Sequence, residues 1–264
     1  MTTPLERLRK DLKTLKLNAL EKNIEQKLTE ALKKKLDLIQ TLEFLLAYQA
    51  RAVIESRMER RIRESKLPER KLLADFDFAF QTGVDKSQIL QLASLSFVEH
   101  TQGVIFAGSS GTGKSHMAKA LMLEACKKLY RCRYTTASQM LSDLLAGLAD
   151  DSLEQKLKIY TRPQILLIDE VGFDRLEQES ARNAALLFKV VDARYGKLST
   201  WFTTNIDFKA LGDYLGDPVV TTAIVDRLIH HSIIINIDGP SWRMHQSEKL
   251  NRSQRKKKTK KKKT

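Results

Sequence analysis

The first 66 residues carry apolar side chains at helical spacing. Leucines and one isoleucine recur there at steps of three and four residues, as on one face of an α-helix. Thr41 is expected to cap a further helix whose apolar face includes Leu42, Leu45 and Leu46. Pro68 disfavours helix at the residue before it, so we expect a small helical domain over residues 1–67. Its predicted core positions are Leu5, Leu8, Leu12, Leu15, Leu20, Ile24, Leu28 and Leu32.

Residues 68–250 alternate short apolar runs with segments of helical period. Four helices are predicted. The first follows residue 115, the second begins after a cap at Ser138, the third runs from about Glu179 to Tyr195, and the fourth from Ala223 to His230. Strands that alternate with helices imply right-handed crossovers and a sheet covered on both faces. The pattern therefore predicts a three-layer α/β domain. Its predicted strands cover residues 103–107, 132–136, 164–169, 198–204 and 233–237.

Charge is concentrated at the two ends of the 264-residue chain, whose formal net charge is +14. Residues 251–264, which we expect to be a disordered tail, contain nine basic side chains and no acid, and residues 1–71 contain 18 basic and 11 acidic ones. Basic ends around a nearly neutral centre favour attachment to nucleic acid, although a lysine-rich tail can also serve solubility alone. The candidate DNA contacts in the helical domain are Lys33, Lys34, Lys35, Arg57, Arg60, Arg61 and Arg63.

The rest of the composition excludes several classes of protein. No apolar run approaches the about 18 residues of a membrane helix, and the N-terminus has no apolar signal core. Two cysteines, Cys126 and Cys132, cannot form a disulfide scaffold, and the five histidines show no spacing typical of zinc ligands. We therefore expect a cytoplasmic protein without a membrane partner or structural zinc.

A phosphate-binding loop is predicted between the first strand and its following helix. The segment Gly108-Ser109-Ser110-Gly111-Thr112-Gly113-Lys114-Ser115 matches G-x-x-x-x-G-K-[ST]. Glycines let successive N–H groups face one anion, and the helix N-terminus adds its positive end. Lys114 can reach the β- and γ-phosphates, and the Ser115 hydroxyl can ligate Mg²⁺. The motif requires a strand before it and a helix after it, and the sequence predicts both.

Two successive acids stand at the carboxyl end of the third predicted strand. Asp169 directly follows the apolar run Ile165–Ile168 and so lies at the carboxyl end of its strand, which is where an open α/β sheet binds its ligand. Its carboxylate can hold Mg²⁺ through water. Glu170 can polarise the attacking water as general base. The alternative is that both acids cap the next helix. The upstream loop favours the catalytic interpretation.

Two further residues are candidates for contact with the γ-phosphate. Asn205 follows the fourth strand, and its amide can bind the phosphate or the lytic water; it can also be a turn residue. Arg227 lies on the predicted helix before the last strand and is a candidate arginine finger for a neighbouring subunit's nucleotide. An intramolecular pair with Asp226 or another acid is the alternative.

The motif set resembles the AAA+ ATPases of the IstB-like group. The glycine-rich loop, Leu166–Glu170, Thr204–Asn205, Asp226–Leu228 and Gly239–Arg243 carry the resemblance. Members of the group are helper proteins of insertion-sequence transposition, related to DnaC helicase loaders and more distantly to DnaA initiators. The resemblance implies a parallel five-stranded sheet of order 5-1-4-3-2.

The resemblance also implies activity and partners. ATP and Mg²⁺ would act at interfaces of a homo-oligomer assembled on duplex DNA, largely without sequence preference, and the assembly would recruit or activate a cognate transposase. Arg243 would stand where a second sensor arginine is expected. Phe76, Phe78 and Phe80 either line the adenine pocket or pack in the core.

Three functions are compatible with the sequence. The first is a DNA-dependent ATPase that helps a transposase. The second is a helicase loader, which would prefer single-stranded DNA. The third is a nucleotide-gated scaffold without hydrolysis, against which Glu170 and Asn205 argue.

Overall fold

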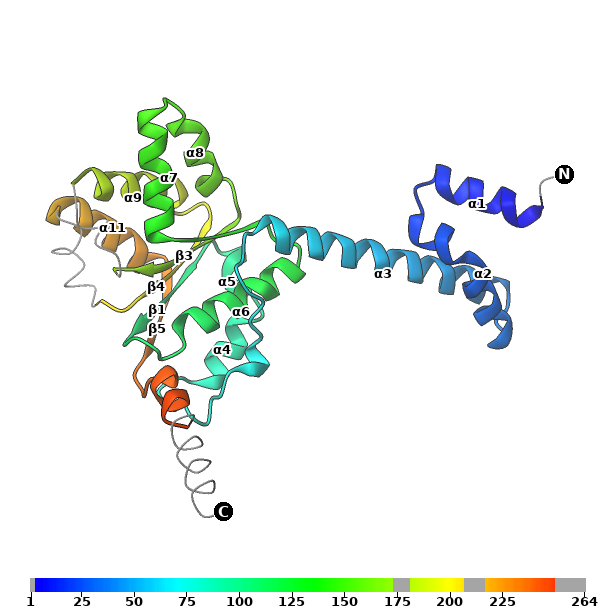
Figure 1. Ribbon diagram of the computed structural model, residues 1–264, viewed down its shortest axis with the longest axis horizontal. Coiled ribbons are helices and arrows are strands. Elements are labelled where there is room, and N and C mark those ends of the chain that lie inside the picture. The colour runs from blue at the N-terminus through cyan, green and yellow to red at the C-terminus, as the bar shows by residue number, and fades with distance from the viewer. Residues whose placement is uncertain (1–2, 173–180, 207–216, 250–264) are drawn as a thin grey trace, which may run out of the picture. The chain divides into compact units, whose positions relative to one another are not determined.

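The chain divides into two compact units in the computed structural model, which describes residues 3–172, 181–206 and 217–249 (Figure 1). The units are Met1–Arg60 and Arg61–Thr264, so they meet inside one helix, whereas the sequence predicts a boundary at residue 67. The predicted tail, residues 251–264, lies outside the described residues. No helix among the described residues is long and apolar enough to cross a membrane.

The first unit is helical. Helix α1 (Pro4–Thr14) begins with a capping box, because the Thr3 hydroxyl accepts from the Glu6 N–H and the Glu6 carboxylate accepts from the Thr3 N–H. Helix α2 (Asn18–Lys33) follows, and then α3 (Leu38–Glu64), most of which belongs to this unit. A small core holds these helices together. Its buried members are Leu12, Leu20, Ile24 and Leu45.

Several leucines predicted for this core are exposed. Leu15 and Leu32 are 67% and 78% exposed, and Leu8, Leu42 and Leu46 are exposed as well. Leu15 and Leu32 lie at the ends of their helices, where little chain is available to cover them. The predicted cap is also wrong, because α3 starts before Thr41. Asp37 caps it instead, accepting from the Gln40 N–H at 2.8 Å.

The second unit is built on a five-stranded parallel sheet. The strand order is β2-β3-β4-β1-β5, which confirms the predicted order 5-1-4-3-2. Predicted and observed strands agree to within two residues at each end. The observed strands are β1 (Gly103–Gly108), β2 (Cys132–Thr136), β3 (Ile165–Val171), β4 (Ser199–Thr204) and β5 (Ser232–Ile237).

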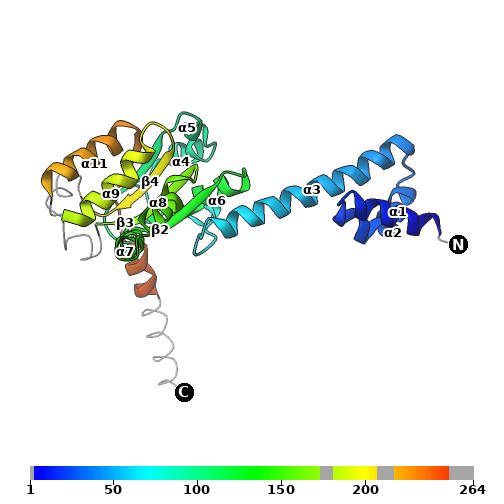
Figure 2. The ribbon, with the colours of Figure 1, turned by 90° about the horizontal axis from the view of Figure 1, so that it is seen from above.

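Helices cover both faces of this sheet, which confirms the three-layer α/β fold (Figures 1 and 2). Successive side chains of a strand point to opposite faces, so Val104 and Phe106 pack in one core and Ile105 in the other. The first core lies under α4 (Lys86–Leu92), α5 (Ser96–Glu99) and α6 (Lys114–Lys127). The second lies under α7 (Ala137–Ala149), α8 (Leu153–Thr161), α9 (Ala181–Arg194) and α11 (Pro218–His230).

Two local features of the second core differ from what its sequence suggests. The cap of α7 is Thr136, whose hydroxyl accepts from the Gln139 N–H, and not Ser138. Arg194, at the end of α9, is fully buried. Its guanidinium donates to carbonyl oxygens and to the Thr200 hydroxyl, and thereby ties the end of α9 to the start of β4.

Candidate nucleotide-binding site

The glycine-rich loop joins β1 to α6 as predicted. Helix α6 begins at Lys114, directly after Gly113, whose φ of 101° a residue with a side chain rarely adopts. The Lys114 amine folds back and donates to the carbonyl oxygens of Gly108 and Ser109, each at 2.7 Å. The loop is therefore closed around its own lysine. Burial lowers the pKa of this amine, and the nearby Arg243 lowers it further.

Segments far away in the sequence pack against the loop. A Cβ on Gly113 would lie 2.4 Å from the Phe76 ring, and one on Gly111 would lie 2.1 Å from the Ser241 hydroxyl. The Trp242 N–H donates to the Gly111 carbonyl at 3.0 Å. Glycine is thus required at both positions by the neighbouring chain as well as by backbone conformation.

An open cavity of about 350 Å³ lies beside the loop. Phe76 and Phe80 line it, whereas Phe78 packs against the first core. Arg243, the predicted second sensor, lines the same cavity as Lys114. Aromatic rings, the glycine-rich loop and three cations, Lys71, Lys114 and Arg243, make a cavity suited to a base and phosphates.

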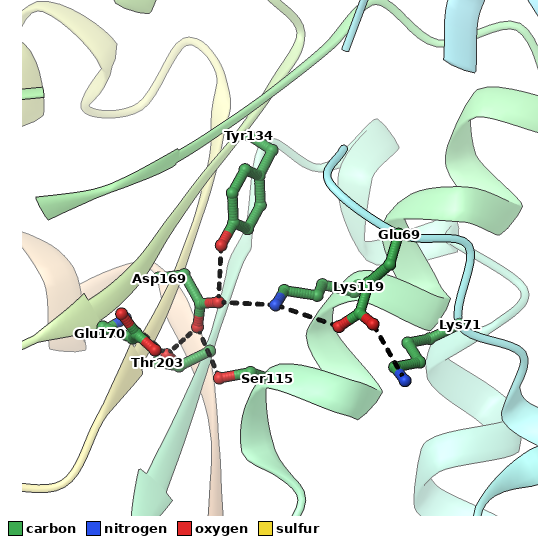
Figure 3. A network of polar contacts seen from close by, with 8 residues as sticks. All are labelled: Glu69, Lys71, Ser115, Lys119, Tyr134, Asp169, Glu170 and Thr203. Atoms are coloured by element: carbon green, nitrogen blue, oxygen red, sulfur yellow. Dashed lines mark hydrogen bonds and ion pairs between the residues drawn. The ribbon is translucent and has the colours of Figure 1, made fainter. Parts of the chain in front are cut away.

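Asp169 is the centre of a polar network next to the loop (Figure 3). Its side chain is fully buried. One carboxylate oxygen accepts from the hydroxyls of Ser115, at 2.7 Å, and Thr203. The other accepts from the Tyr134 hydroxyl at 3.0 Å and lies 3.4 Å from the Lys119 amine. Burial and the Asp169 charge raise the pKa of Tyr134, which keeps its hydroxyl a donor.

The same network tests whether Mg²⁺ fits. The Ser115 hydroxyl and the Asp169 carboxylate are oxygen donors in direct contact, as a hard cation needs. No group of three or more acidic, histidine or cysteine side chains that could hold a metal is present in the described part of the chain. One hydroxyl and one carboxylate next to a phosphate loop still fit Mg²⁺, because phosphates and waters supply its remaining ligands.

Glu170 sits in an unusual backbone conformation. Its φ of 62° lies in the left-handed region, which is rare for a residue other than glycine. Ile168 pairs with Phe202 and Val171 with Thr204, so two residues of β3 face the single residue Thr203. This is a bulge, and bulges redirect side chains at functional sites. The Glu170 N–H donates to the Thr203 hydroxyl at 2.9 Å, so Thr203 holds both acids.

The other predicted γ-phosphate contacts are placed differently. Asn205 is exposed and follows β4 directly. Arg227 does not line the cavity of its own chain: its Nε donates to the Asp192 carboxylate at 2.9 Å, and its guanidinium lies over the Phe188 ring. The intramolecular alternative is therefore present, with Asp192 as the acid and not Asp226.

The predicted DNA contacts form two separate groups. Lys33, Lys34 and Lys35 lie before α3, whereas the arginines of the set, residues 57–63, lie in its last turns. At 1.5 Å per residue, roughly 28 Å of helix separates Leu38 from Arg57. Within the first unit, Arg57 is therefore too far along α3 to form one local patch with the three lysines.

Sequence reasoning missed three residues whose side chains contact the Asp169 carboxylate: Lys119, Tyr134 and Thr203. Thr203 had a usable signal, since it lies in the last two residues of β4, two positions before Asn205. Tyr134 and Lys119 had none, because only the pairing of β2 with β3 and the position of α6 bring them to Asp169.

The family model of the "IstB-like ATP binding protein" matches residues 10–250. The chain belongs to this family. It is 32% identical over 244 residues to "Insertion sequence IS232 putative ATP-binding protein" of Bacillus thuringiensis subsp. berliner, covering 92% of this chain and 96% of that protein. It is 34% identical over 238 residues to "Insertion sequence IS21 putative ATP-binding protein" of Pseudomonas aeruginosa, covering 90% and 89%.

Solved structures agree on the fold. The DnaI structure is similar with a TM-score of 0.54 and 21% identity, covering 64% of this chain and 92% of that one. The DnaC helicase loader is similar with a TM-score of 0.50 and 22% identity, covering 58% and 87%. At this identity the likeness concerns the AAA+ fold alone. The family is thus an ATP-binding one, and its fold is that of AAA+ proteins.

Proposed function

We propose that this protein is a Mg²⁺-dependent ATP hydrolase of insertion-sequence transposition. It assembles on duplex DNA with ATP between subunits and recruits or activates a cognate transposase. The observation that supports hydrolysis is the bulge of β3 at Asp169 and Glu170, which gives Glu170 a left-handed backbone conformation that ATP binding alone does not require. The names of its relatives, which place them in insertion sequences, support the role in transposition.

The residues divide the work of hydrolysis among them. The loop N–H groups and the Lys114 amine bind the β- and γ-phosphates, for which the amine leaves the carbonyls of Gly108 and Ser109. Ser115 and Asp169 would hold Mg²⁺, which, when bound, neutralises charge on the phosphates. Glu170 takes the proton from the water that attacks the γ-phosphorus, and ADP leaves as phosphate forms.

Arg227 and Asn205 complete the site in this proposal. Arg227 pairs with Asp192 at 28% side-chain exposure and is therefore accessible to a neighbouring subunit. On assembly its guanidinium would exchange Asp192 for the neighbour's γ-phosphate, a stronger anion. Asn205 lies at the carboxyl end of β4, next to the strand that carries the two acids. Its amide would orient the lytic water.

The test is ATP hydrolysis by the purified protein alone, with duplex DNA and with single-stranded DNA. Lys114→Ala is the blank, because it lacks the amine for the phosphates. Stimulation by duplex DNA that the blank loses supports the proposal. Stimulation by single strands alone would instead favour a helicase loader, and no hydrolysis under any condition would overturn the assignment as an ATP hydrolase.

A further inference from the structure

A second, strongly basic cavity lies within the Arg61–Thr264 unit, and the nucleotide site does not use it. Its volume is about 250 Å³. Arg131 directly precedes β2 and Arg162 shortly precedes β3, so the cavity lies at the amino ends of these strands. Ser115 and Asp169 lie at the carboxyl ends, on the opposite edge of the sheet. The two sites can therefore be occupied independently.

The charge of this cavity is nearly all positive. Five cationic side chains and one carboxylate line it. The carboxylate is that of Glu64, which pairs with Arg61 at 3.1 Å. No ion pair engages Arg131, Lys158 or Arg162 among residues 3–172, 181–206 and 217–249. The cationic lining residues are Arg61, Arg131, Arg133, Lys158 and Arg162.

One lining residue, Arg133, has a buried side-chain donor without an acceptor. The Nε–H of Arg133 has no hydrogen-bond partner in the described part of the chain, although the atom is inaccessible to solvent. Leaving such a donor unpaired costs about 1–3 kcal/mol. The Arg133 guanidinium is held over the Tyr160 ring, 5.8 Å from its centroid, which limits the positions it can take.

Helix stabilisation accounts for only part of this cluster. Lys158 and Arg162 lie at the C-terminal end of α8, where cations interact favourably with the helix dipole. Arg131 and Arg133 belong to the start of β2, and no such role exists for them. Convergence of a strand, a helix end and Arg61 from α3 on one cavity calls for an external anion.

We infer that this cavity binds phosphate groups of the DNA backbone. Guanidinium groups match phosphate oxygens with paired N–H donors, and phosphate contacts carry no sequence information. None of the residues that line the cavity has an aromatic side chain on which a base could stack, so contact with the DNA backbone is favoured over contact with bases. The inference rests on the proposed binding of duplex DNA and places part of it in the ATPase unit. Of the predicted DNA contacts, it includes only Arg61.

The test is the double variant Arg131→Gln/Arg162→Gln in the full chain. The hydrogen bonds described for both residues are made by their backbone atoms, so the substitutions leave the fold intact. Lys86→Gln/Lys197→Gln is the matched control, because it removes two charges from the same unit outside the cavity. Arg131→Lys/Arg162→Lys keeps the charge and should keep most of the binding.

The measurement is anisotropy of labelled duplex DNA over a series of salt concentrations. Losing two phosphate contacts should flatten the log–log salt slope by about 1.8 and weaken binding about 60-fold at about 0.1 M salt, at roughly 0.9 counterions per contact. The control should keep the wild-type slope. Binding of a fluorescent ATP analogue should be equal in all variants.

Each other outcome overturns a different statement. A cavity variant that binds DNA like the control overturns the cavity inference and leaves the proposed function standing. Wild-type protein that binds no duplex DNA overturns both. Loss of binding to inorganic phosphate or polyglutamate, with unchanged DNA binding, would make the cavity a site for a free anion or an acidic peptide and overturn the DNA assignment.

Discussion

Replacing Thr203 by valine should separate ATP hydrolysis from ATP binding. Thr203 is 1% exposed, and valine has the same shape without the hydroxyl. That hydroxyl accepts from the Glu170 N–H at 2.9 Å and donates to the Asp169 carboxylate. It is the described contact that ties the bulged residue Glu170 to β4.

The size of the effect follows from these two hydrogen bonds. An unpaired buried donor costs about 1–3 kcal/mol, and a left-handed φ at a residue other than glycine also costs about 1–3 kcal/mol. In Thr203→Val the Glu170 backbone loses the partner that holds it there and relaxes. We expect a loss of about 2–3 kcal/mol of transition-state stabilisation, or roughly a 30- to 150-fold fall in kcat. The affinity for ATP should stay within about threefold, because the loop is unchanged.

The assay is steady-state phosphate release together with titration of a fluorescent ATP analogue. Thr204→Val is the matched control: Thr204 is buried as well, and its hydroxyl accepts from the Ile206 N–H at 3.1 Å, away from both acids. Equal kcat in the two variants would refute the positioning role of Thr203. A rise in Kd without a fall in kcat would refute it as well.

Other predictions test the proposed assembly and the buried network. Glu170→Gln should bind ATP but hydrolyse it at least about 100-fold more slowly, so that DNA-bound oligomers persist in light scattering; disassembly at the wild-type rate would contradict the general-base role. Lys114→Ala and Arg227→Ala should each be inactive, whereas their mixture should regain part of the activity if the arginine acts across the interface. Deleting residues 252–264 should flatten the DNA salt slope by up to about 8, and an unchanged slope would exclude the tail from DNA binding. Burial and Asp143 raise the pKa of Tyr160 to about 12, above the value of about 10 in an unfolded chain. The contribution of this residue to the free energy of unfolding is therefore complete below pH 10 and is lost toward pH 12. Tyr160→Phe should flatten the fall of the urea midpoint in this alkaline range.

Much of the nucleotide-binding site could be predicted from the sequence, because its motifs are contiguous in the chain. The phosphate loop occupies eight successive residues, so spacing alone identified it, and both Asp169 and Glu170 come directly after the apolar run Ile165–Ile168. Helix caps were less predictable. Thr41 and Ser138 have suitable side chains, but Asp37 and Thr136 lie where the backbone turns into the helix. Side-chain type alone does not fix which of several polar residues performs the capping.

The sequence by itself determined the strands, the loop and the residue types of the chemistry, because apolar period and loop motifs are local properties of the chain. The resemblance added the strand order. The tertiary structure alone decided that β3 bulges opposite Thr203, that Tyr134 and Lys119 reach Asp169, and that Arg227 pairs with Asp192. It also brought Arg131 and Arg162 into one basic cavity. These contacts join residues about 30 or more positions apart, and strand register and helix packing set them, neither of which leaves a periodic trace in the sequence.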